Sequence, residues 1–121
     1  MAAPHDAPTA AQLIEAVREW LERDVAASTE GRLKFHARVA ANVLAIVERE
    51  LDLGGLQATE HAARLARLGV PDDAALAAGI RRHEFDDRLD EVRELLLSSV
   101  IDKLLVANPG YLNGAGVRLT G

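Results

Sequence analysis

Apolar residues recur every three or four positions along most of this 121-residue chain, and that spacing limits what it can fold into. Such a rhythm places apolar side chains on one face of a helix, whereas a half-buried strand needs strict alternation, which no segment shows. No internal repeat divides the sequence, and its length allows one hydrophobic core. We therefore predict an all-α fold, a single compact bundle of about five helices, two of them long. The domain is expected over residues 8–112, with flexible ends at 1–7 and 113–121.

Capping and breaking residues set the expected limits of these helices. Thr9 and Gln12 form a capping-box pattern at the start of the first helix, which reaches about Val25 before a connection over Ala26–Gly31. The longest helix is expected from Arg32 to Leu53 and to end at Gly54-Gly55, because glycine is common just beyond helix ends. Three further helices are expected. The first covers Gln57–Leu68 and ends at Gly69, and the second covers Asp73–His83, with Asp72 or Asp73 as its cap and a weak point at Gly79. The third covers Asp87–Ala107 and ends before Asn108-Pro109. Leu112–Gly121 is predicted to be a loose tail.

The composition excludes several classes of function. No cysteine is present, which rules out disulfides, thiolate catalysis and cysteine-based metal sites. The formal net charge of −5 disfavours binding to nucleic acid or to anionic membranes. No apolar run is long enough to cross a bilayer, and Met1–Asp6 lacks the features of a secretion signal. We expect a cytoplasmic protein that binds neither nucleic acid nor membrane.

The longest predicted helix carries two apolar stripes. The first is predicted to face the core, and it consists of Phe35, Val39, Val43 and Ile46. Arg32 and Glu50 lie at its two ends, where long side chains can reach water, and His36 and Asn42 flank it. Asn42 is predicted to be half-buried and to need a hydrogen-bond partner. Leu33, Leu44 and Leu51 form the second stripe, so this helix is expected to contact neighbours on two sides.

The last long helix shows a similar arrangement. Its main stripe consists of Leu89, Leu96, Leu97, Val100, Leu104 and Ala107, with Lys103 at the edge. On the opposite side Leu95, Leu105 and Val106 surround Ser98 and Asp102. Two interpretations stay open: either other helices wrap this one on all sides, or the face around Asp102 docks another chain.

Residues that could carry chemistry are scattered. The four histidines lie on different segments without metal-ligand spacing, and the paired carboxylates sit at expected helix starts, where they complement the helix dipole. Ser98 and Ser99 have no evident base or oxyanion site, and no phosphate-binding glycine motif occurs. We expect no catalytic residue, no metal and no cofactor. The basic cluster of Arg32, Lys34, His36 and Arg38 suits either a phosphate or coenzyme A anion or a solvated helix face.

The run from Gly31 to Leu51 resembles a family of small bacterial helical proteins known as a domain of unknown function. The family pattern is G-R-x-x-F-H-x-R-V-A-x-N-x-L-x-I-V-x-R-E-L, and every position is present. Pro8–Leu13 and Asp102–Tyr111 also resemble its ends, so the similarity spans about residues 8–112. Members are typically encoded beside an aminoglycoside-phosphotransferase-like kinase and an acyl-CoA dehydrogenase. The resemblance implies an accessory subunit of a kinase that phosphorylates hydroxyacyl-CoA, as in levulinate breakdown.

Three hypotheses follow. The leading one is a non-catalytic subunit that binds and supports such a kinase; the others are a small domain that binds a phosphate or coenzyme A-type anion, and a homo-oligomeric helical protein. A helical transcription regulator is disfavoured by the negative charge. The candidate partner or ligand residues are Arg32, Phe35, His36, Arg38, Asn42, Ser98, Asp102, Lys103, Asn108 and Tyr111.

Overall fold

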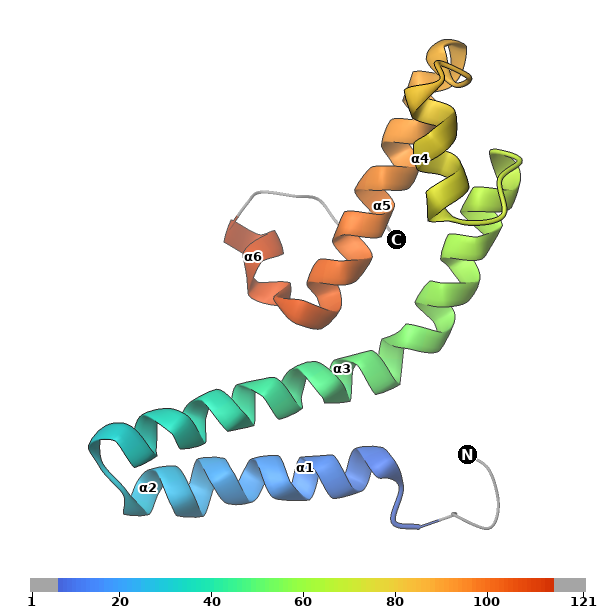
Figure 1. Ribbon diagram of the computed structural model, residues 1–121. Helices are drawn as coiled ribbons and strands as arrows, with labels where there is room; N and C mark the ends of the chain where they lie inside the picture. Colours follow the sequence, from blue (N-terminus) through green and yellow to red (C-terminus); the bar gives the residue numbers. More distant parts are fainter. Residues whose placement is uncertain (1–6, 115–121) are drawn as a thin grey trace. The chain divides into compact units, whose positions relative to one another are not determined.

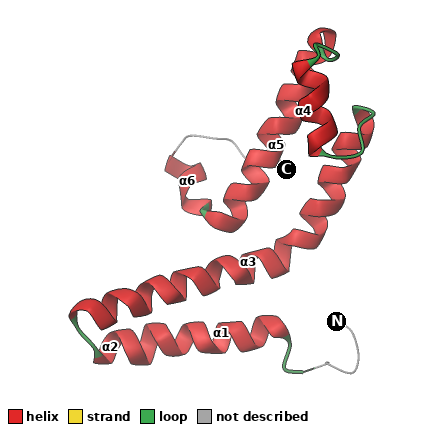
Figure 2. Ribbon diagram, viewed as in Figure 1, coloured by secondary structure: helices red, strands yellow, loops and turns green. Residues whose placement is uncertain are grey.

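The computed structural model describes residues 7–114, and within them the all-α prediction is confirmed (Figures 1 and 2). The helices are α1 (Ala10–Trp20), α2 (Ala26–Ser28), α3 (Gly31–Arg67), α4 (Asp73–Arg81), α5 (Leu89–Ala107) and α6 (Pro109–Gly114). A π turn over Leu21–Val25 joins α1 to α2, and a 3₁₀ turn over Asp86–Arg88 leads into α5. The chain divides into two compact units, and the boundary in the sequence lies between Asp52 and Leu53.

The N-terminal unit is a helical hairpin. The predicted capping box starts α1: the Gln12 amide donates to Thr9 Oγ1, and the Thr9 amide donates to Gln12 Oε1. The helical path continues to Ser28, beyond the predicted end near Val25, because the π turn accommodates one extra residue without breaking the helix. Gly31 begins α3 with a φ of 61°, a value that glycine adopts without strain. Arg18 on α1 then donates to Glu48 on α3 across 2.8 Å.

The face of α3 that meets α1 is not the predicted one. Among the described residues of this unit the buried side chains are Ala26, Ala37 and Ala41, and both α3 alanines lie on the helix face of Glu48. Phe35, Val39 and Val43 lie on the opposite face and are exposed, so the prediction that they face the core is wrong. A hairpin of two helices has one internal contact, and the alanine face occupies it. Leu33 and Leu51 of the second stripe are exposed as well, and Leu44 is half-buried.

The predicted break at Gly54-Gly55 is also wrong, because α3 continues through both glycines for 37 residues in all. Good helix formers on either side outweigh the cost of about 1 kcal/mol for each glycine, and Thr59 Oγ1 donates to the Gly55 carbonyl. The helix ends instead at Arg67, two residues before Gly69, whose φ is 79°. There the amide of Val70 donates to the Leu65 carbonyl and that of Gly69 to the Ala66 carbonyl, the two hydrogen bonds of a Schellman motif.

The hydrophobic core of the C-terminal unit draws on α3, α4, α5 and the segment before the 3₁₀ turn. Its buried members are Leu65, Leu68, Leu76, Phe85, Val92 and Leu95. Asp72 caps α4 by accepting from the Ala75 amide, as its position predicts. The chain leaves α4 through a second Schellman-type turn in which His83 adopts a φ of 62°.

The end of α5 lies where it was predicted, whereas the segment that follows it is not the loose tail expected from Leu112 on. α5 stops at Ala107, before Asn108-Pro109, and Pro109 then opens α6, where proline fits the first helical turn. Within α6, Leu112 is the most buried side chain of the described chain, with 1% of its surface exposed. The prediction of a loose segment is therefore wrong for Leu112. Residues 1–6 and 115–121, also predicted to be flexible, lie outside the described part.

Replacing Gly55 or Gly79 by alanine should change stability in opposite directions. Nothing lies within 4 Å of an added Cβ at Gly55, so this change should stabilise the chain by about 0.5–1 kcal/mol. A Cβ at Gly79 would lie 2.5 Å from Cε2 of the buried Phe85 ring, and Gly79→Ala should cost roughly 1–3 kcal/mol. Chemical denaturation measures the free energy of unfolding of both variants. Both changes reduce the conformational entropy of the unfolded chain in the same way, so each variant is a control for the other. Equal stabilisation by the two alanines would contradict this packing.

Candidate functional site

A polar face of α3 organises the C-terminal unit. Gln57, His61 and Arg64 lie one turn apart along α3, and each reaches α5. Arg64 Nη1 donates to Asp102 Oδ2 over 3.2 Å, and Gln57 Nε2 donates to the Asp102 carbonyl over 3.0 Å. The carboxylate and guanidinium are largely covered, with 22% and 16% of the side chains exposed. Asp102 therefore has an internal partner, which explains a charged residue among leucines.

His61 links three helices. Its Nε2 lies 2.8 Å from Asp73 Oδ1 at the start of α4, and its Nδ1 lies 3.1 Å from Ser99 Oγ on α5. The Ser99 hydroxyl also lies within donating distance, 3.0 Å, of the Leu95 carbonyl. Gln57, His61 and Arg64 are not among the candidate residues predicted from the sequence. A helical wheel drawn for residues 57–68 would have shown them on one face.

A serine, histidine and aspartate in contact raise the question of nucleophilic catalysis. Such chemistry needs an accessible hydroxyl and hydrogen-bond donors aimed at a developing oxyanion. Ser99 is half-buried in the middle of α5, where the nearby backbone amides are committed to helical hydrogen bonds. The Ser99–His61–Asp73 contacts therefore join helices, and within the described residues we assign them no catalytic role.

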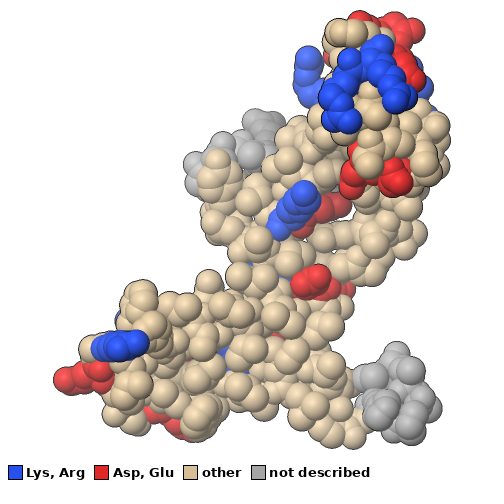
Figure 3. All heavy atoms as spheres, viewed as in Figure 1, with Lys and Arg blue, Asp and Glu red and all other residues tan. Residues whose placement is uncertain are grey.

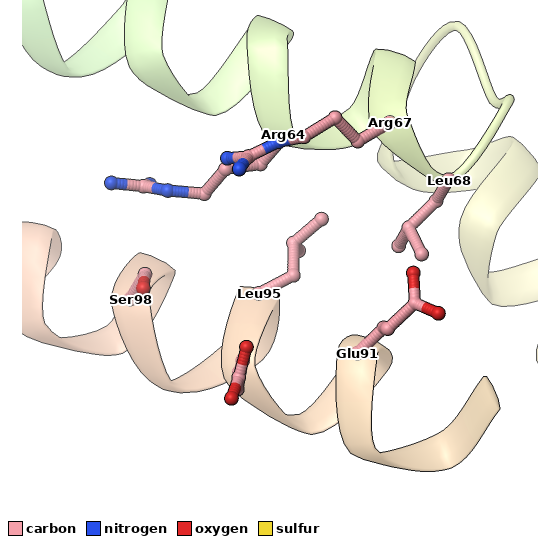
Figure 4. A pocket seen from close by; sticks show the side chains of 7 residues that line it. Arg64, Arg67, Leu68, Glu91, Leu95 and Ser98 are labelled. Carbon is pink, nitrogen blue, oxygen red and sulfur yellow. The ribbon is translucent and has the colours of Figure 1, made fainter.

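A cavity of about 380 Å³ opens between α3 and α5 (Figure 4). It is lined by Arg64, Arg67, Leu68, Glu91, Glu94, Leu95 and Ser98. Hydrogen bonds from Arg88 lower the pKa of the Glu91 carboxyl, so Glu91 stays charged beside the two arginines. Since two carboxylates balance two guanidinium groups, the cavity does not offer the net positive charge that a phosphate needs.

The outward face of α5 carries four half-exposed apolar side chains, with the exposed Arg93 among them. Leu89, Leu96, Leu97 and Val100 have about half of their surfaces exposed, whereas Val92 and Leu95 point into the core. The interpretation that other helices wrap α5 on all sides is therefore wrong. The interpretation that the Asp102 face is open for docking is also wrong, because α3 covers that face through Arg64 and Gln57. The open apolar surface is the main stripe itself.

Five candidate residues lie on the first part of α3. Arg32 Nε lies 3.4 Å from His36 Nε2, and the His36 ring meets the edge of Phe35 with 5.6 Å between ring centroids. Asn42 is exposed rather than half-buried as predicted, and Arg38 is exposed too. Lys34 is half-buried and lies away from the Arg32–His36 pair. The cluster therefore does not converge on one point, and its binding of an anion stays a prediction.

The other five candidates lie in the C-terminal unit with separate surroundings. Ser98 lines the cavity, Asp102 pairs with Arg64, and Lys103 is exposed. The Asn108 carbonyl accepts from the amide of Tyr111, whose side chain is exposed. The described residues contain no group of three or more metal-ligating side chains, and none of their helices combines the length and apolar character that a membrane crossing requires.

Comparison with known proteins gives one result. A family model described as "Domain of unknown function (DUF6285)" matches residues 27–111, which extend from α2 into α6. No curated protein and no solved structure matches the chain.

Asp102→Ala should lower the free energy of unfolding by about 1–2 kcal/mol, because the largely covered Arg64 guanidinium loses its nearer carboxylate and keeps only Glu60, at 3.6 Å on the same helix. A double-mutant cycle with Arg64→Met should give a coupling energy of about 1 kcal/mol. The matched control is the open Arg93–Asp90 pair on α5, whose coupling should stay below about 0.5 kcal/mol. Equal coupling in the two cycles would show that the Arg64–Asp102 contact is no more than a surface pair.

Proposed function

The chain belongs to the DUF6285 family of domains of unknown function, and we propose that it is a non-catalytic accessory subunit. It binds and supports an aminoglycoside-phosphotransferase-like kinase that acts on hydroxyacyl-CoA. The kinase class and the substrate class rest on the resemblance of the run Gly31–Leu51. The absence of cysteine fits a cytoplasmic role.

The observation that carries the proposal is the uncovered apolar stripe of α5. Leu89, Leu96, Leu97 and Val100 stand on one side of a helix whose other side already fills the core. Single exposed leucines are ordinary, but a row of them along a helix is typical of a surface that another protein covers. Covering a half-exposed leucine contributes on the order of 1 kcal/mol, so the row can anchor a stable complex.

The polar residues of the described chain support a binding role over a catalytic one. Arg64, His61 and Asp102 are held in contacts between helices, and the cavity beside them carries balanced charge. A phosphoryl transfer requires a concentration of positive charge on the transferred group, supplied by metal ions, lysine or arginine. In this proposal the kinase chain supplies that charge and holds ATP. The present chain supplies an apolar helix face that completes the fold of its partner.

Co-expression with a kinase of this class from the same organism tests the proposal. Size-exclusion chromatography should show a complex, and phosphorylation of a hydroxyacyl-CoA should be stronger with the chain than without it. Leu96→Glu should remove both effects, because it places a charge in the apolar contact. Leu56→Glu is the matched control, since Leu56 is an exposed leucine of the same unit on α3.

Two results would overturn the proposal. One is the absence of a complex together with unchanged kinase activity. The other is an equal loss of binding in Leu96→Glu and Leu56→Glu, which would show that binding does not depend on the α5 stripe.

A further inference from the structure

The outer face of α3 in the N-terminal unit is a second uncovered apolar surface. Phe35, Val39 and Val43 are 63%, 44% and 52% exposed on the side of α3 turned away from α1. The internal side of the hairpin is filled by alanines, and these larger side chains keep about half of their surface exposed. In the view of Figure 3, this unit is largely uncharged along its length, and charged atoms gather near the hairpin turn.

The charges on this face have a pattern of their own. Arg32 lies at one end of the stripe and Glu50 at the other, 18 positions apart, or about 27 Å along the helix axis. Among the described residues Glu50 makes no ion pair, and Arg32 makes a single side-chain hydrogen bond, to His36. Opposite charges at the two ends of an apolar stripe make the stripe complementary to a copy of itself that runs in the opposite direction.

We propose that two copies of the chain pair through this face, with their α3 helices antiparallel about a two-fold axis level with Ala41. In that register Arg32 meets Glu50 of the second copy, and Val39 meets Val43 of the second copy. Phe35 packs beside Ile46 of the second copy. The pairing does not depend on the kinase, and it uses a surface on the other unit from the α5 stripe.

Asn42 supports the same register. Its exposed carboxamide makes no hydrogen bond to another described side chain, and it lies one position from the symmetry axis. The two Asn42 side chains of the pair therefore lie near each other. Each carboxamide can donate a hydrogen bond to the other and accept one from it. A polar residue near the centre of an apolar seam is a known means of fixing the register of paired helices.

The size of the face sets the expected strength of the pair. A helix face of about five turns buries on the order of 600 Å² per partner, below the roughly 800 Å² of a standard interface. We therefore expect a dimer that dissociates in the micromolar range. The opposite charges placed symmetrically about the stripe centre favour a second copy of the chain as the occupant of this face.

Sedimentation velocity of the full chain over a wide range of concentrations tests the pairing. The native chain should shift from monomer to dimer, and Val43→Glu should weaken the dimer at least about 100-fold, because it brings two charges into the seam. Val17→Glu is the control, since Val17 is a similarly exposed valine on α1, and it should leave the dissociation constant unchanged. Circular dichroism on each variant verifies that the helices stay folded.

A charge exchange tests the antiparallel register directly. Arg32→Glu and Glu50→Arg should each weaken the dimer several-fold, because each creates two like-charge contacts. The double variant restores opposite charges and should return to within about twofold of the native dissociation constant. A chain that stays monomeric at all concentrations would overturn the proposal, as would equal effects of Val43→Glu and Val17→Glu. So would a double variant weaker than both single ones.

Discussion

Ala37 and Ala41 fill the contact between α3 and α1, and this choice of small side chains governs what the N-terminal unit presents outside. Alanines allow two helices to approach closely, but they remove little apolar surface from water. The larger side chains of the same helix then have to lie elsewhere, and Phe35, Val39 and Val43 lie on the outer face. A hairpin built in this way leaves its larger apolar side chains exposed.

The C-terminal unit packs its helices through large apolar side chains and polar contacts, in contrast to the alanines of the N-terminal unit. Six larger apolar side chains form a true core there, and Gln57, His61 and Arg64 fasten α3 to α5 beside it. Polar groups that are committed to holding helices together are not free to act on a substrate. What the unit does expose is the leucine-rich side of α5. Both units therefore offer apolar helix faces, and neither offers a catalytic arrangement among the described residues.

Local signals predicted much of this fold. Thr9 with Gln12, Asp72 and the Asn108-Pro109 pair each act within one helical turn, and each marks a helix limit in the structure. Gly54-Gly55 wrongly predicted a helix end, because the other residues of the 37-residue helix compensate for the low helix propensity of the two glycines. The helical wheels grouped Phe35 with Val43 correctly, but a wheel cannot tell which of two apolar faces a neighbour will cover. The pairing of Asp102 with Arg64 joins residues 38 positions apart, and no local pattern encodes it.

Hydrogen exchange along the chain tests the claim that these faces exist to be covered. The measurement compares dilute chain, concentrated chain and chain mixed with the kinase, and follows the α3 amides before residue 53 and the α5 amides separately. Our account predicts that concentration slows exchange in the first part of α3, and that the kinase slows exchange in α5. Exchange that stays the same in both helices under all three conditions would contradict it.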